Sequence, residues 1–165
     1  KELMKTYSGP LIYIDYADLR VPSAAERREA FLAACGERGR VCAVPRRGDD
    51  AAEMARLLGR LAGEGALPAG IVCNSGGVGL LAAKWLRERG LEEACALAAV
   101  DYLPEMEEYP MLAYEQPMDR LAETAYRRLV AQTNEGEGWR AETFRLPGRL
   151  IRCGKPGTTH ERNGD

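Results

Sequence analysis

The sequence lacks the features that mark several large classes of protein. It has one histidine, His160, and no two cysteines with a C-x-x-C spacing, so a zinc site with nitrogen and sulfur ligands is not predicted. No stretch approaches the 18 or more apolar residues of a membrane-spanning helix. The 23 basic and 25 acidic residues are well mixed, so no basic surface is available for nucleic acid. We therefore expect no metal, no membrane partner and no DNA binding by this chain alone.

The cysteines indicate a reducing compartment. They are odd in number and widely spaced, and three lie in apolar runs, where a thiol behaves as a small apolar group. This pattern favours free core thiols and a cytoplasmic protein. The five residues are Cys35, Cys42, Cys73, Cys95 and Cys153.

One domain is predicted over residues 1–153, followed by a polar tail, residues 154–165, that we expect to be disordered. The first ten residues, KELMKTYSGP, do not resemble a signal peptide. They also do not begin with Met, and we interpret the chain as a piece of a longer protein.

Short apolar runs alternate with helical stretches, and this alternation predicts the fold. Strands are expected at Leu11–Ile14, Val41–Val44, Gly70–Cys73 and Ala96–Val100, each bounded by residues that favour turns. Helices are expected over 23–39, 49–65, 77–90 and 116–138, and two strand-like pieces within 142–153, broken by Pro147-Gly148. Strand and helix in alternation indicate an α/β fold, a Rossmann-like parallel sheet in three layers with helices on both faces.

The stretch GIVCNSGGVGLL, residues 70–81, is the most informative local motif. It joins a strand to a helix through a polar pair and three glycines. Ligands of open parallel sheets bind beyond the carboxyl ends of the strands, and the residues that close the four predicted strands are Asp15, Pro45, Asn74 and Asp101. Of these, the amide of Asn74 and the carboxylate of Asp101 suit a hydroxyl-bearing ligand best.

A dinucleotide site is one alternative for this stretch. Gly77 to Ala82 fits G-x-G-x-x-A, and Asp101 closes the next strand at the position of a ribose-binding acid. However, Asn74-Ser75 separates the strand from the glycines, whereas a dinucleotide loop turns almost directly into its first glycine. A second alternative is that the glycines only permit close helix packing. We expect no cofactor.

Five further motifs, in order over residues 9–153, carry a family resemblance. They are RREAF, CNSGGVGLLAAKWLRERGL, AAVDYLP, MLAYEQPMDRLAETAYRRL and RLPGRLIRCG. Together they resemble the C-terminal part of the effector-binding domain of the lactose-repressor/galactose-repressor family of bacterial transcription regulators. This resemblance implies a type I periplasmic-binding-protein fold, with the C-terminal subdomain and its return segment present here.

The resemblance also implies a ligand site. Arg27, Asn74 and Asp101 would converge on a sugar or similar polar effector, with Tyr102 or Tyr16 as a flat apolar face for the ring. The implied protein is a cytoplasmic homodimeric regulator that binds operator DNA through a helix-turn-helix absent from this chain.

The sequence departs from the family's pattern at three positions, and one other function is compatible with the same fold. The family's usual residues are replaced by Ser75, Ala99 and Tyr102, so the identity of the effector does not transfer. An extracytoplasmic sugar-binding protein of a transport system would share the same fold. No nucleophile with a neighbouring base and no useful pair of carboxylates is present, so an enzyme is not predicted.

Overall fold

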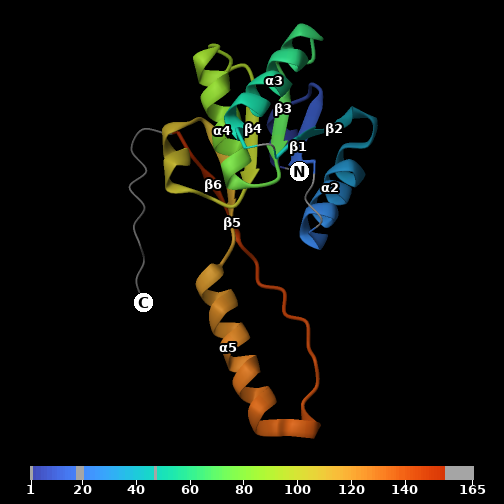
Figure 1. Cartoon of the computed structure of the whole chain (residues 1–165), viewed down its shortest axis with the longest axis vertical. Coiled ribbons are helices and arrows are strands. Elements are labelled where there is room, and N and C mark those ends of the chain that lie inside the picture. The colour runs from blue at the N-terminus through green and yellow to red at the C-terminus, as the bar shows by residue number, and fades with distance from the viewer. Residues whose placement is uncertain (1, 18–20, 47, 155–165) are drawn as a thin grey trace.

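A single six-stranded sheet organises the chain in a computed structural model that describes residues 2–17, 21–46 and 48–154 (Figure 1). The strand order is β2-β1-β3-β4-β5-β6, with β1 to β5 parallel and β6 antiparallel to β5. The strands are β1 (Leu11–Tyr16), β2 (Gly39–Val44), β3 (Gly70–Cys73), β4 (Ala96–Val100), β5 (Met111–Glu115) and β6 (Arg149–Arg152). The predicted α/β class is confirmed. Apart from Gly154, the predicted polar tail lies outside the described residues.

Helices cover both faces of this sheet. The helices are α1 (Glu2–Thr6), α2 (Pro22–Cys35), α3 (Asp50–Gly63), α4 (Gly76–Glu88) and α5 (Met118–Glu135), with short 3₁₀ turns η1 (Gly36–Arg38), η2 (Pro104–Glu108) and η3 (Gly136–Gly138). Alternate residues of β1 separate into two buried clusters. Ile12 and Ile14 pack with α3 and α4, whereas Leu11 and Tyr13 pack with α1 and α2.

The helix α5 departs from this arrangement. Figure 1 shows α5 and the segment that follows it extending away from the sheet, before the chain returns as β6. None of the α5 residues is buried. Large apolar side chains on this helix are exposed: Met118, Leu121, Tyr126, Leu129 and Val130. In the described part of the chain, no helix is long and apolar enough to cross a membrane.

Several local expectations need correction. The strand β5 was not among those predicted, and only β6 forms where two strand-like pieces were expected, because residues 139–148 carry no regular structure. The sheet is therefore mixed rather than wholly parallel. The first predicted helix, α2, begins at Pro22 after Val21 without a side-chain cap, and ends at Cys35, where Gly36 has φ 55°.

The strand order fixes where a ligand can bind. The chain passes from β1 outward to β2 and then returns to β3 on the other side of β1. The connections that leave β1 and β3 therefore run in opposite directions, and in open α/β sheets ligands generally bind at the carboxyl ends of two such strands. The side chains that follow these two strands are the first to inspect.

Candidate functional site

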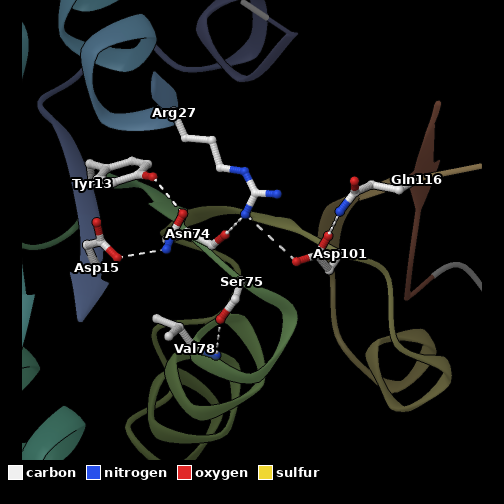
Figure 2. Close-up of polar contacts among 8 residues, drawn as sticks. All are labelled: Tyr13, Asp15, Arg27, Asn74, Ser75, Val78, Asp101 and Gln116. Carbon is white, nitrogen blue, oxygen red and sulfur yellow. Dashed lines mark hydrogen bonds and ion pairs between the residues drawn. The ribbon is translucent and has the colours of Figure 1, made fainter. Parts of the chain in front are cut away.

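Side chains from four strand ends and one helix form a continuous polar row at this edge of the sheet (Figure 2). The structure brings together three of the predicted ligand-binding residues, Arg27 from α2, Asn74 after β3 and Asp101 after β4. Arg27 Nη1 donates to the main-chain oxygen of Asn74 at 3.0 Å and lies 3.9 Å from Asp101 Oδ2. The side chains of Arg27 and Asp101 remain 29% and 39% exposed, so both charges face solvent.

Asp101 is held from two sides. Its carboxylate accepts a hydrogen bond from Gln116 Nε2, and its main-chain nitrogen donates to the oxygen of Tyr114 at 2.9 Å. Its φ of 70° lies in the left-handed region, which Asp tolerates better than most residues. The main-chain oxygen of Asp101 also packs directly on Gly76, where an added Cβ would lie 2.3 Å from it.

The side chain of Asn74 points into the protein rather than out of it. It is 2% exposed. Its Oδ1 accepts from the hydroxyl of Tyr13 at 3.0 Å and its Nδ2 donates to Asp15 Oδ1 at 2.7 Å. Asn74 thus reaches the exposed row through its main-chain oxygen, and direct contact between its amide and a ligand stays a prediction.

The two predicted tyrosine platforms lie in different surroundings. The Tyr16 hydroxyl donates to Asp50 Oδ2 at 3.0 Å, and the guanidinium of Arg46 sits 4.7 Å from the centre of its ring, so one ring face is already covered. The Tyr102 hydroxyl donates to Glu107 Oε1 at 3.0 Å, and burial, with Glu107, raises the pKa of Tyr102 to about 12.

A hollow of about 950 Å³ adjoins the row on the side of Tyr102. Its volume is within the range of small-molecule sites. Charged side chains of both signs line it, together with Tyr102, Gln116 and the start of α5. The charged residues are Asp101, Glu115, Asp119, Arg120 and Arg149.

Sequence reasoning missed three members of the row. Gln116 stands in the quoted EQP motif but was not assigned a role. Asp15 closes a predicted strand, but the sequence gives no reason to prefer it to Asn74 and Asp101. Tyr13 carries no signal, because a tyrosine inside an apolar run is typical of a core residue.

Of the three glycines that follow Ser75, two serve packing. A Cβ on Gly79 would lie 2.6 Å from the Cβ of Ala99, and one on Gly76 would strike Asp101, whereas Gly77 faces open space. Ser75 caps α4, its Oγ accepting from the nitrogen of Val78. Two of the three glycines are thus explained by the close approach of α4 to β4.

This arrangement suits hydrogen bonding to a polyhydroxylated molecule. A carboxylate accepts two hydroxyl protons and a guanidinium donates to the oxygens of the same hydroxyls.

Among the described residues, no group of three or more His, Cys, Asp or Glu side chains is placed to hold a metal ion.

Comparisons with known proteins agree with the fold. The profile of a family described as periplasmic binding protein-like domain matches residues 12–152. No curated protein matches the chain.

Solved structures share the fold at low sequence identity. A glucose-galactose binding protein of Geobacillus stearothermophilus superimposes with a TM-score of 0.72 at 16% identity, covering 92% of this chain and 56% of that one. A LacI family transcriptional regulator from Arthrobacter gives 0.72 at 19%, covering 94% and 60%. An ABC transporter solute-binding protein of Agrobacterium vitis with bound allitol gives 0.70 at 19%, covering 92% and 57%. The chain thus spans just over half the length of each.

Proposed function

Because this chain belongs to the periplasmic binding protein-like domain family, we propose that it forms one wall of a cleft that binds a sugar or polyol. The observation that carries the proposal is the exposed pair of Arg27 and Asp101, whose charges face each other across 3.9 Å at the carboxyl edge of the sheet. The similar structures include a glucose-galactose binding protein and a solute-binding protein with bound allitol.

The chemistry of the pair matches such a ligand. Vicinal hydroxyls on a ring present donors and acceptors at fixed spacing, so a carboxylate and a guanidinium bind them through paired hydrogen bonds. Gln116 orients the carboxylate, and the ring of Tyr102 borders the same hollow. The tethered donor and acceptor lose little conformational entropy when the ligand arrives.

A second wall completes the cleft. The similar structures extend well beyond the length of this chain, and α5 carries apolar side chains that nothing in the described residues covers. We propose that this face of α5 packs against the other lobe of a longer parent protein, and that ligand binding closes the two lobes on each other.

Within this family we assign the chain to the effector-binding domain of a dimeric regulator of the lactose-repressor type that acts in the cytoplasm. The quoted motifs favour it, and so do the five cysteines, all free and buried. Ligand-driven closure would then shift the parent between two arrangements of different operator affinity. The alternative, a receptor of a sugar transport system, uses the same cleft and presents its closed form to a membrane partner.

Nuclear magnetic resonance titration of the isotope-labelled chain tests the site. D-Galactose and allitol are added to the wild type, to Asp101→Asn, and to Glu93→Gln as a control that removes an exposed carboxylate from a different loop. We expect shifts at Arg27, Asp101 and Gln116 that are lost only in Asp101→Asn. Equal shifts in all three proteins would reject the site.

A gel-shift assay with the full-length parent separates the two functions. A regulator retards operator DNA in a way that depends on the sugar. A parent with a signal peptide and no helix-turn-helix would instead be the transport receptor.

A further inference from the structure

Tyr13 and Asp15 form the buried end of the polar row (Figure 2). They lie two residues apart on β1, so their side chains leave the same face of the sheet, on the α2 side. Tyr13 is 1% exposed and Asp15 is 5% exposed. Both hydrogen-bond to the Asn74 amide, 61 and 59 residues away in sequence.

These two partners select one orientation of that amide. With Nδ2 toward Asp15 and Oδ1 toward Tyr13, each contact joins a donor to an acceptor. Rotating the amide by 180° would set its oxygen against the carboxylate oxygen of Asp15, two acceptors without a proton between them. The pair therefore fixes the side chain of Asn74 in one state.

The main chain of Asn74 is fixed as well. Its nitrogen donates to the oxygen of Ile14 at 2.9 Å, and its oxygen accepts from Arg27 Nη1 at 3.0 Å. Hydrogen bonds at all four polar atoms thus lock residue 74, and the last of them holds the guanidinium of Arg27.

The consequence is visible in the distance between Arg27 and Asp101. Most of the other ion pairs among the described residues are closer: Arg56 to Glu53 is 2.8 Å and Arg40 to Glu64 is 2.9 Å, whereas Arg60 to Glu64 is also 3.9 Å. Arg27 stays 3.9 Å from Asp101, because the oxygen of Asn74 holds the guanidinium on one side while Gln116 holds the carboxylate on the other. The pair is kept apart, and both partners retain hydrogen-bonding capacity for a ligand.

We propose that Tyr13 and Asp15 are positioning residues that, through Asn74, hold Arg27 away from Asp101 and keep the pair open. The proposal deepens the proposed function and rests on it only in assigning the open pair to a sugar. Buried carboxylates without a cationic partner are unfavourable. In the part of the chain that the structure describes, Asp15 accepts hydrogen bonds from Asn74 and from the main-chain nitrogen of Tyr16, both of which are neutral donors.

The test measures the mobility of the Arg27 guanidinium in the full chain without any ligand. ¹⁵N relaxation at Arg27 Nε reports it, with Arg27→Lys used for assignment. Tyr13→Phe deletes one hydroxyl and Asp15→Ala deletes the acceptor, whereas Asp15→Asn keeps an oxygen that accepts from Asn74. Tyr109→Phe is the control, a second buried tyrosine.

We expect an order parameter of about 0.8 for Arg27 in the wild type, in Asp15→Asn and in Tyr109→Phe, and a fall below about 0.6 in Tyr13→Phe and Asp15→Ala. Rescue by Asp15→Asn separates positioning from a general packing role. If Asp15→Ala does not fold, Tyr13→Phe decides the matter. A mobile Arg27 in the wild type, or an unchanged Arg27 in Tyr13→Phe, would overturn the proposal.

A parallel titration with D-galactose keeps the two proposals distinguishable. An immobile Arg27 that loosens in Tyr13→Phe, together with no galactose or allitol binding by the wild type, supports positioning and rejects the sugar site. Sugar binding with an Arg27 that does not respond to Tyr13→Phe supports the site and rejects positioning.

Discussion

Two adjacent glycines at the start of α4 offer a sharp test of how the site is built. A Cβ on Gly76 would lie 2.3 Å from the main-chain oxygen of Asp101 and 2.9 Å from Cγ of Leu103. A Cβ on Gly77 would meet nothing within 4 Å. The two replacements by alanine are identical in chemistry and differ only in what surrounds them.

The expected magnitudes follow from these distances. Gly76→Ala forces the backbone of Asp101 or the helix to move, and overpacking of this kind costs about 1–3 kcal/mol. Gly77→Ala removes a flexible residue from the first turn of a helix and should be neutral or stabilising, by up to about 1 kcal/mol. The two variants should therefore differ by about 1–4 kcal/mol, or roughly 2–16 °C in melting temperature for a domain of this size.

Urea and thermal denaturation measure this difference, and the amide resonance of Asp101 reports the local displacement. We expect Gly76→Ala to shift that resonance and to weaken any sugar binding, and Gly77→Ala to do neither. Equal stability of the two variants would show that α4 does not approach Asp101 as described. A phosphate-binding role for the glycines would instead make Gly77→Ala harmful to ligand binding and leave protein stability unaffected.

Four further outcomes are expected. Asp101 has a φ of 70°, which strains alanine but not glycine, so Asp101→Gly should be about 1 kcal/mol more stable than Asp101→Ala in urea denaturation. Equal stability of the two variants would contradict the left-handed conformation. Burial raises the pKa of Tyr13 from 10.0 to about 12, so the contribution of its hydroxyl to stability is complete below pH 10 and is lost as the pH rises through 12. The difference in free energy of unfolding between wild type and Tyr13→Phe should narrow between pH 10 and 12, and a constant difference would refute the shift in pKa. The apolar face of α5 should make the isolated chain self-associate in sedimentation experiments, and Leu129→Glu should reduce this, whereas a strictly monomeric wild type would contradict it. Neither NAD nor FAD should raise the melting temperature, since a bound ligand at 100 times its dissociation constant adds about 2.7 kcal/mol, and a clear shift would revive the dinucleotide interpretation.

Local sequence patterns were sufficient for four of the six strands and for the four longer helices, α2 to α5. The strands β1 to β4 follow from apolar runs bounded by turn residues, and the buried side of α3 follows from the spacing of Met54, Leu57, Leu58 and Leu61, all of which are buried. The strand β5 was missed because MLAYE is short and lies between Pro110 and Gln116-Pro117, which together resemble a loop.

What the sequence determined by itself is the class of fold, the edge of the sheet where a ligand site is expected, and the residues Arg27, Asn74 and Asp101 as candidates for it. Each depends on short-range periodicity, on the rule that strand ends share one edge, or on the order of motifs along the chain. Only the tertiary structure showed that the side chains of Arg27 and Asp101 face solvent and that the side chain of Asn74 is buried. Whether the Asn74 amide faces a ligand or the interior depends on β1 and β3 being neighbours, which joins residues about 60 positions apart. No local pattern specifies that pairing, because strand order results from packing the helices over the whole sheet.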